Sequence, residues 1–211
     1  MKTFLFTIYF FTLMTISCQL NAQTYTIETN LGNIQVKLYE QTPLHKENFE
    51  TLVAKQFYND VLFHRIIAGF MIQTGNPATK VTPSELDLNY TVPAEFVPEY
   101  FHKKGALAAA RTGDAVNPEK RSSSSQFYIV QGRTYMDAEL DQVEQQLQVK
   151  FSELQREIYK TIGGTPFLDQ NYTVFGEVVK GLDIVDAIAS VQTGRGDVPV
   201  EDIRILRVVK D

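Results

Sequence analysis

The sequence predicts a mainly β fold, a closed or nearly closed antiparallel barrel with helices over its ends. Many short apolar or alternating runs are separated by loops rich in Gly, Pro, Asn and Ser, which is typical of short antiparallel strands. Only two short helices are expected among these runs, too few for a sheet in which strands and helices alternate. The chain has 211 residues, of which 44% are hydrophobic, and these values are typical of one domain with its own core.

The N-terminus carries a candidate signal peptide. Lys2 precedes an apolar run from Phe4 to Ile16, which is too short to cross a bilayer core of about 30 Å but is typical of a secretory signal. We expect residues 1–22 to be removed after Ala22 and residues 23–211 to form the domain. The protein is therefore expected to be exported, either to the periplasm or out of the cell.

Cysteine usage leaves a second destination open. Cys18 is the only cysteine and lies just after the apolar run. This position weakly resembles the cleavage site of a bacterial lipoprotein, although Thr15 stands where such sites usually have Leu. A membrane-anchored lipoprotein, with its lipid on Cys18, is the alternative to a released protein. A single cysteine excludes a disulfide framework in both cases.

The charge distribution argues against nucleic-acid binding. The formal net charge is −5, and no cluster of Lys and Arg is longer than the pair Lys103 and Lys104. Domains that bind nucleic acids usually carry a basic patch that neutralises phosphates. We therefore exclude DNA and RNA as partners.

The first elements of the domain are a hairpin and a helix. Residues 24–40 contain two alternating runs around a turn in which Gly32 can adopt a positive φ, so they predict a β-hairpin. A helix is expected next, with Thr42 as its N-cap and Pro43 at its first position. The apolar face of this helix is predicted to hold Leu44, Phe49, Leu52 and Val53.

The remaining elements follow the same reasoning. Further strands are expected at residues 62–67, 70–73, 106–110, 127–130 and 173–178. A second short helix is expected at residues 181–191, and a closing strand at residues 203–209.

Residues 137–162 interrupt this pattern. Their apolar positions recur at spacings of three and four, which is helical periodicity and indicates an inserted helical segment. Ser152 and Gln155 form a possible capping box, which favours two helices with a break near Phe151. The apolar stripe is expected to pack against the domain, and a groove that binds a partner is the alternative. The stripe consists of Leu140, Val143, Leu147, Phe151, Leu154, Ile158 and Ile162.

Four segments carry a family resemblance. The stretch FHRIIAGFMIQTGNP at residues 63–77 strongly resembles the signature of cyclophilin-type peptidyl-prolyl isomerases. GALAAARTG at 105–113, SSQFYI at 124–129 and FLDQNYTVFGEVVKGLDIVDAI at 167–188 follow in the order that the family uses. The resemblance covers nearly the whole chain after the signal, apart from the helical segment.

The resemblance implies a fold and a function. The fold is a closed eight-stranded β-barrel capped by two helices, in agreement with the elements expected above. The function is peptidyl-prolyl cis-trans isomerisation, which would accelerate the rotation of X-Pro bonds as exported proteins fold. The implied partners are proline-containing polypeptides, no cofactor and no metal are needed, and a monomer is expected.

Arg65 is out of place in an apolar run unless it is paired or works at a site. Rotation about an X-Pro bond must break amide resonance, against a barrier of about 18–20 kcal/mol. In the twisted transition state the prolyl nitrogen regains its lone pair, so a donor placed there binds that state selectively. A guanidinium stays charged and offers donors in a fixed fork. Arg65 matches the catalytic arginine of the family.

The resemblance also implies a substrate-binding site. Phe70, Met71, Tyr128, Phe167 and Leu168 match the apolar pocket for the proline ring. Gln73 and Gln126 match positions that bind the peptide or orient the arginine, and Ala110 and Arg111 match the edge where the peptide backbone pairs.

Three positions depart from the common family pattern. Tyr172 stands where many members have a histidine, and Arg111 stands where many have an asparagine. Phe167 replaces a tryptophan that is associated with cyclosporin binding. Activity is expected to survive these changes, whereas sensitivity to cyclosporin does not follow from the resemblance.

Other functions remain as alternatives. A proline-peptide binding or chaperone module on the same fold would need the pocket but not the arginine. The serine run at residues 122–125 raises a hydrolase reading, but the chain has no G-x-S-x-G motif. His64 is expected to be packed and hydrogen-bonded, without a catalytic role. The spacing of the three histidines is not typical of metal ligands.

Overall fold

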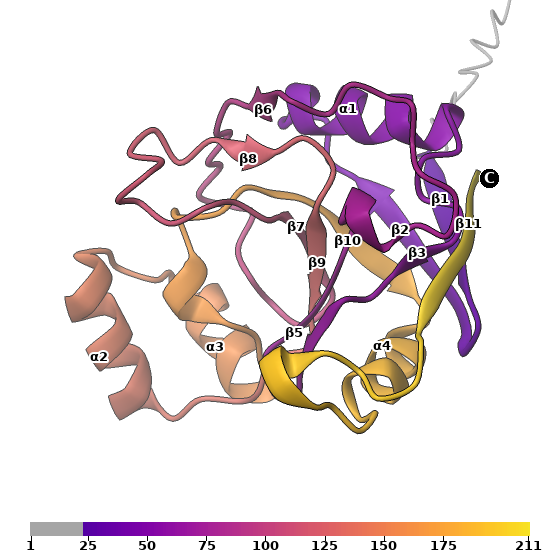
Figure 1. Ribbon diagram of the computed structural model, residues 1–211. Coiled ribbons are helices and arrows are strands. Elements are labelled where there is room, and N and C mark those ends of the chain that lie inside the picture. The colour runs from indigo at the N-terminus through magenta and orange to yellow at the C-terminus, as the bar shows by residue number, and fades with distance from the viewer. Residues whose placement is uncertain (1–22) are drawn as a thin grey trace, which may run out of the picture.

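The computed structural model describes residues 23–211, so the candidate signal peptide and Cys18 lie outside the described residues. Within this range a nine-stranded antiparallel sheet, in the order β3-β11-β1-β2-β10-β7-β9-β5-β4, curls around the main core (Figure 1). A second sheet pairs only β6 with β8. The mainly β, antiparallel fold is confirmed. The strands are β1 (Thr24–Thr29), β2 (Gly32–Leu38), β3 (Val61–Leu62), β4 (Arg65–Ile67), β5 (Met71–Thr74), β6 (Thr91–Val92), β7 (Ala106–Ala109), β8 (Ser122–Ser123), β9 (Phe127–Val130), β10 (Val174–Lys180) and β11 (Arg204–Lys210).

Four α-helices accompany the sheet within the described range. They are α1 (Pro43–Ala54), α2 (Asp137–Leu147), α3 (Glu153–Thr161) and α4 (Leu182–Ala189). Figure 1 shows α1 and α4 at opposite ends of the curled sheet, as expected for the two capping helices. Three short 3-10 helices, η1 (Pro77–Thr79), η2 (Pro166–Leu168) and η3 (Arg195–Asp197), lie in the connections. No helix within residues 23–211 is both long and apolar enough to cross a membrane.

The prediction of a closed eight-stranded barrel is wrong, because the sheet is an open half-barrel. The single strand expected at residues 62–67 is split into β3 and β4, which become the two edges of the sheet. At the break, the Phe63 amide donates to Ile203 O over 2.8 Å, whereas the His64 amide donates to Gln73 O over 3.1 Å. The chain thus leaves β11 and joins β5 within two residues. The two edge strands follow one another along the chain and do not pair.

Helix α1 begins at Pro43 as predicted, but its cap and one face residue differ. The Thr42 hydroxyl donates to Tyr39 O over 3.3 Å and does not cap the helix. Instead, the Glu95 carboxylate accepts from the amides of Leu44 and His45, each over 3.0 Å. Leu44 is exposed, and His45 takes the buried position beside Phe49, Leu52 and Val53.

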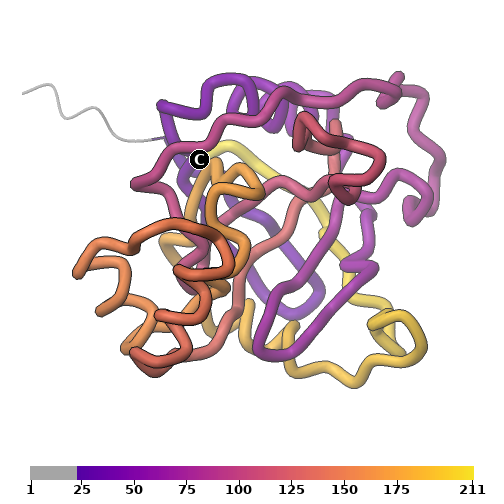
Figure 2. The backbone as a smooth tube through the Cα atoms, turned by 90° about the vertical axis from the view of Figure 1, so that its left-hand side faces the viewer, coloured from indigo at the N-terminus to yellow at the C-terminus, as the bar shows by residue number. Residues whose placement is uncertain are grey.

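The predicted helical segment forms two helices beside the sheet, drawn in orange in Figures 1 and 2. Ser152 caps α3 through the expected box with Gln155, and Phe151 lies in the break. The stripe is only partly buried, because Leu154 and Ile162 are exposed. The segment forms an apolar cluster with two residues outside it, Phe101 and Tyr135. Its own members of this cluster are Leu140, Val143, Phe151 and Tyr159.

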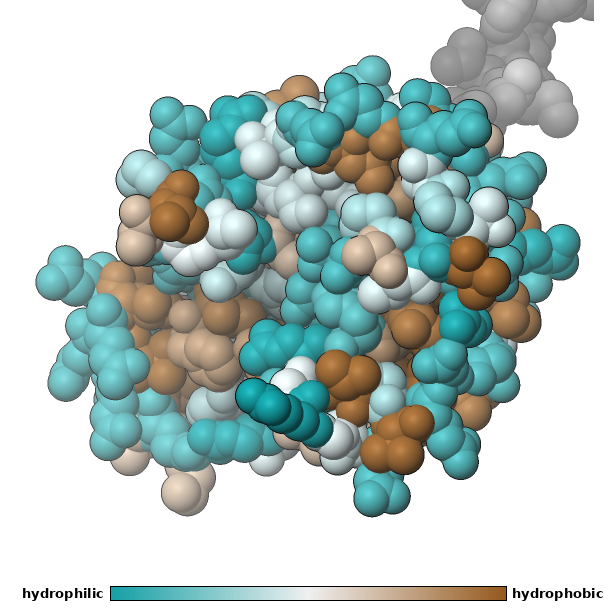
Figure 3. Space-filling model, in the orientation of Figure 1, coloured by the Kyte–Doolittle hydropathy of each residue, from teal (hydrophilic) through white to brown (hydrophobic). Residues whose placement is uncertain are grey.

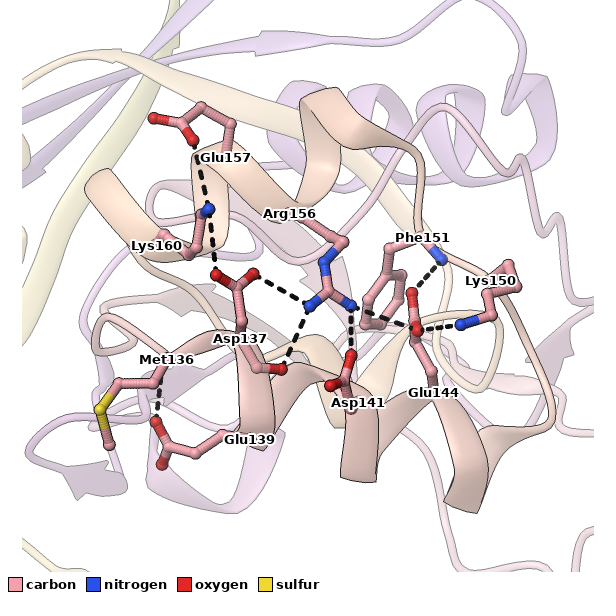
Figure 4. A network of polar contacts seen from close by, with 10 residues as sticks. All are labelled: Met136, Asp137, Glu139, Asp141, Glu144, Lys150, Phe151, Arg156, Glu157 and Lys160. Atoms are coloured by element: carbon pink, nitrogen blue, oxygen red, sulfur yellow. Dashed lines mark hydrogen bonds and ion pairs between the residues drawn. The ribbon is translucent and has the colours of Figure 1, made fainter.

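A charged network holds α2 against α3 (Figure 4). Glu144 is buried and accepts from Lys150 Nζ over 2.7 Å and from the Phe151 amide over 2.8 Å. The Arg156 guanidinium bridges from α3 to Glu144 at 3.2 Å and to Asp141 at 3.0 Å, both on α2. Because a buried carboxylate needs partners for its charge, these contacts tie the two helices together.

Candidate active site

An open pocket of about 100 Å³ lies where the edge hairpin β4-β5 meets β9, the end of β7 and η2. It brings together all the predicted site residues except Gln126 and Phe167. Its lining consists of Arg65, Phe70, Met71, Gln73, Ala110, Arg111, Tyr128, Leu168 and Tyr172. In Figure 3 an apolar patch lies on the side of α2 and α3, below the loop that leads to β8.

Gln126 and Phe167 lie next to this pocket. The Gln73 side chain donates from Nε2 to Gln126 Oε1 over 3.2 Å, and Gln126 lines a neighbouring hollow of about 310 Å³. The Phe167 ring lies 5.6 Å from the Phe70 ring and is partly exposed at the rim. The whole predicted set is therefore contiguous, with these two residues at its border.

Strand register aligns the polar side of the pocket. Arg65 lies opposite Gln73 in the β4-β5 ladder, and Gln73 lies opposite Tyr128 in the β5-β9 ladder. Residues opposite one another in antiparallel strands present their side chains on the same face. Arg65, Gln73 and Tyr128 consequently form a row across three strands. Gly69, with φ of 72°, provides the turn that brings β4 and β5 together.

Arg65 is a surface group at the pocket and not a buried core cation. Its side chain is 43% exposed, and Nε donates to Asp197 Oδ2 over 3.3 Å. Its two terminal nitrogens make no hydrogen bond to any of residues 23–211. An ion pair exposed on both sides contributes at most about 1 kcal/mol to stability, so the contact with Asp197 orients the guanidinium more than it stabilises the fold.

Asp197 is the residue at this site that sequence reasoning missed. It lies 132 positions from Arg65, in η3, and its own φ of 62° is unusual for a residue with a side chain. Gly196 before it also has a positive φ, of 76°. The glycine in the segment RGD at residues 195–197 predicts a turn, but no pattern in the sequence predicts that this turn contacts the β4-β5 hairpin.

The apolar wall is part of a second core cluster. Met71 and Tyr128 are buried, whereas Phe70 and Leu168 are only partly buried and pack against them. Met adapts its shape to neighbouring groups more easily than branched residues do. The wall is thus anchored at its base and accessible at its rim, as binding a small apolar ring requires.

Of the two residues predicted to pair with the peptide backbone, only Arg111 has a free backbone amide and carbonyl among the described residues. The Ala110 amide donates to Gln126 O over 3.0 Å, and Ala110 O accepts from the Ser123 amide over 2.8 Å. The backbone amide and carbonyl of Arg111 have no such partner within the described residues. The Arg111 guanidinium lies 4.4 Å from the centre of the Tyr172 ring, and its Nε donates to Asn171 O over 2.7 Å.

A serine, a histidine and a glutamate do meet elsewhere in the fold. His45 Nδ1 lies 2.6 Å from Glu95 Oε2, and its Nε2 lies 2.8 Å from Ser122 Oγ. Ser122 is only 1% exposed, so its hydroxyl cannot reach a substrate. This arrangement joins α1 to β8 and gives the hydrolase alternative no usable nucleophile.

His64 meets its expected state in part. Its Nδ1 atom is buried without a hydrogen-bond partner among the described residues, whereas the Leu62 backbone and the Gln126 side chain lie within hydrogen-bonding reach of the ring. Burial lowers the pKa of His64, which favours the neutral ring. The same range of residues holds no cluster of His, Cys, Asp and Glu arranged for a metal ion.

The His45 contacts predict a pH dependence of stability. Burial lowers the pKa of His45 below its ordinary 6.5, so on acidification the unfolded chain takes up a proton before the folded protein does. The free energy of unfolding should be constant above about pH 7 and fall below pH 6.5, by up to about 1.4 kcal/mol per pH unit. Urea unfolding between pH 5 and 8 should show a shallower fall for His45→Gln. An equal fall in both proteins would assign the effect to other groups.

Comparison with known proteins agrees with this geometry. Residues 24–210 match the family described as cyclophilin type peptidyl-prolyl cis-trans isomerase. A putative peptidyl-prolyl cis-trans isomerase of Staphylococcus saprophyticus is 36% identical over 180 residues, which span 85% of this chain and 87% of that protein. A peptidyl-prolyl cis-trans isomerase of Acinetobacter baylyi is 33% identical over 188 residues, 86% of this chain and 82% of that protein.

Solved structures show the same fold. A cyclophilin type peptidyl-prolyl cis-trans isomerase from Cryptosporidium parvum superposes with a TM-score of 0.66 at 23% identity, covering 90% of this chain and 97% of that chain. The same protein crystallised in the presence of the dipeptide Ala-Pro gives a TM-score of 0.65. At this identity the structures support the fold alone. With the family match and the relatives above, the chain belongs to the cyclophilin-type peptidyl-prolyl cis-trans isomerase family.

Proposed function

We propose that this protein accelerates the rotation of X-Pro bonds with Arg65 as its catalytic residue. One observation carries the assignment: a half-exposed guanidinium borders a pocket with an apolar wall, with Nε engaged by Asp197 and no partner for its terminal nitrogens among residues 23–211. In the planar ground state the prolyl nitrogen accepts no hydrogen bond. As the bond twists, its lone pair becomes available, and the guanidinium stabilises that state selectively.

The pocket fits the other requirement, a grip on the proline ring. Its volume of about 100 Å³ and its apolar wall are typical of a small site that takes one ring. Phe70, Met71, Tyr128 and Leu168 would contact the ring. The backbone of Arg111 would pair with the peptide, and Gln73 would orient the substrate or the arginine.

A protease-coupled assay on a tetrapeptide with one Ala-Pro bond tests this function. Without a catalyst the cis bond converts over tens to hundreds of seconds, so catalysis appears as a faster slow phase. We expect acceleration by micromolar purified protein. Peptide binding without acceleration would favour the binding module instead, and neither binding nor acceleration would remove both readings.

We also propose that this is an exported bacterial protein that acts on exported proteins as they fold. The apolar run after Lys2 and the small residue Ala22 support cleavage of a signal peptide. Bacterial relatives in Staphylococcus and Acinetobacter are compatible with a bacterial source. Mass spectrometry of the mature protein should find Gln23 as the first residue, whereas a diacylglycerol-modified Cys18 would establish the lipoprotein alternative.

A further inference from the structure

A chain of buried hydrogen bonds runs from the helical segment to the pocket. The Tyr159 hydroxyl donates to Asp169 Oδ2 over 2.6 Å, and His102 Nδ1 lies 2.8 Å from Asp169 Oδ1. At the other side of the imidazole, His102 Nε2 lies 3.0 Å from the Tyr128 hydroxyl. Each of these four residues is at most 4% exposed.

The chemistry of the groups gives this chain a single direction. A carboxylate only accepts hydrogen bonds, so the Nδ1–H group of His102 donates to Asp169. Burial keeps the pKa of Tyr128 well above its usual value, so the Tyr128 hydroxyl keeps its proton and donates to Nε2. Burial and the nearby Asp169 charge keep the pKa of Tyr159 well above its usual value, so this hydroxyl also remains a donor.

Every side-chain polar group in this chain of hydrogen bonds has a partner. Asp169 also accepts from the His102 backbone amide over 2.8 Å, which fixes the carboxylate relative to the segment that leads into β7. A buried polar network that is fully satisfied holds its members in one arrangement, whereas the loss of one member leaves another unpaired. The orientation of each ring therefore depends on the next.

The two ends of the chain belong to different parts of the protein. Tyr128, on β9, is part of the pocket wall, and its ring meets the Tyr172 ring edge-on at 6.0 Å. Tyr159 lies on α3 and packs against the rings of Phe101 and Phe151, each at 5.5 Å. The apolar cluster of the helical segment thus anchors one end, and the proline pocket lies at the other.

We propose that Tyr159 is a positioning residue for the isomerase, through which the helical segment holds the Tyr128 wall of the pocket via Asp169 and His102. This inference rests on the proposed function of the pocket. It assigns residues 137–162 a role in substrate binding that needs no direct contact with the substrate.

The test is the variant Tyr159→Phe in the full chain, assayed with the same Ala-Pro tetrapeptide. The phenyl ring preserves the aromatic packing and removes only the hydroxyl. Because the pocket wall contacts the proline ring in both ground and transition states, KM should rise roughly three- to tenfold while kcat changes less than about twofold. Tyr135→Phe is the matched control, since Tyr135 packs on Tyr159 and its hydroxyl makes no hydrogen bond to residues 23–211.

A double-mutant cycle distinguishes positioning from general destabilisation. Tyr128→Phe removes the last donor of the chain, so adding Tyr159→Phe to it should raise KM no further. A KM for Tyr159→Phe equal to that of wild type, or an independent rise in the double variant, would overturn the proposal. A fall only in melting temperature would also overturn it.

Nuclear magnetic resonance of the unmodified protein, labelled on tyrosine, provides a measurement that needs no folded variant. Saturation with the tetrapeptide should shift the ring resonances of both Tyr128 and Tyr159, and leave those of Tyr135 in place. A shift confined to Tyr128 would contradict the coupling. Failure of the proposed function would look different, because the wild-type protein itself would then not accelerate isomerisation of the peptide.

Discussion

Replacing Arg65 with lysine is expected to lower kcat/KM by about tenfold to a thousandfold, or ~1.4–4 kcal/mol of transition-state stabilisation. Lysine keeps the charge but replaces a planar fork with a compact, strongly hydrated ammonium on a flexible stem. It also loses the Nε donor that Asp197 holds at 3.3 Å, so nothing would fix the direction of the remaining donor. The same peptide assay measures the effect.

Binding and stability should change much less than catalysis in Arg65→Lys. The planar nitrogen of a ground-state proline peptide has no lone pair to offer, so the dissociation constant should move by less than about threefold. The side chain is 43% exposed, and substitutions at such positions usually change stability by less than about 1 kcal/mol. Arg195→Lys, an exposed neighbour of Asp197 on η3, is the matched control and should retain wild-type kinetics.

Two results would contradict a catalytic Arg65. One is an equal loss of affinity and turnover, which would indicate a general binding role. The other is a large drop in melting temperature with normal activity per folded molecule, which would make Arg65 a structural residue of the β4 edge.

The second large effect is on stability: Phe49→Ala should lower the free energy of unfolding by about 3–5 kcal/mol. Phe49 is 2% exposed at the centre of the main core. Its ring lies between 5.2 and 5.9 Å from four other aromatic rings, those of Tyr25, Tyr58, Phe127 and Phe175. Truncation removes these contacts and leaves a cavity that the surrounding strands cannot close.

Leu44→Ala on the same helix is the control for this prediction. The apolar pattern places both residues on one face, but Leu44 is 45% exposed, so its truncation should cost less than about 1 kcal/mol. Urea unfolding with a fixed slope between the variants compares the two directly. Equal losses in the two variants would mean that α1 packs through its whole predicted face.

The sequence alone was sufficient for features that depend on near neighbours. The β1-β2 hairpin, the start of α1 at Pro43 and the capping box at Ser152 all follow from spacings of a few residues. The motif around Arg65 identified the family, and with it the residues that the fold brings together, nine in one pocket and Gln126 and Phe167 at its border. Their catalytic and binding roles remain predictions until the variants are measured.

The tertiary structure decided the features whose partners are distant in the sequence. Glu95 replaces Thr42 as the cap of α1 from 50 residues away, and Asp197 reaches Arg65 across 132 residues. No local pattern encodes such pairs, because they arise only when the sheet has curled and brought its loops together.

The edges of the sheet and the hydrogen bonds that link Tyr159 to Tyr128 also depend on partners that are distant in the sequence. Alternation predicted one strand at residues 62–67, yet the backbone switches partners at Phe63 and His64, since β11 and β5 lie on either side of that point. Tyr159 reads in the sequence as a helix residue outside the apolar stripe. Only the tertiary structure packs its ring against Phe101 and brings its hydroxyl to Asp169, because burial depends on which surfaces meet and not on the spacing of residues along one helix.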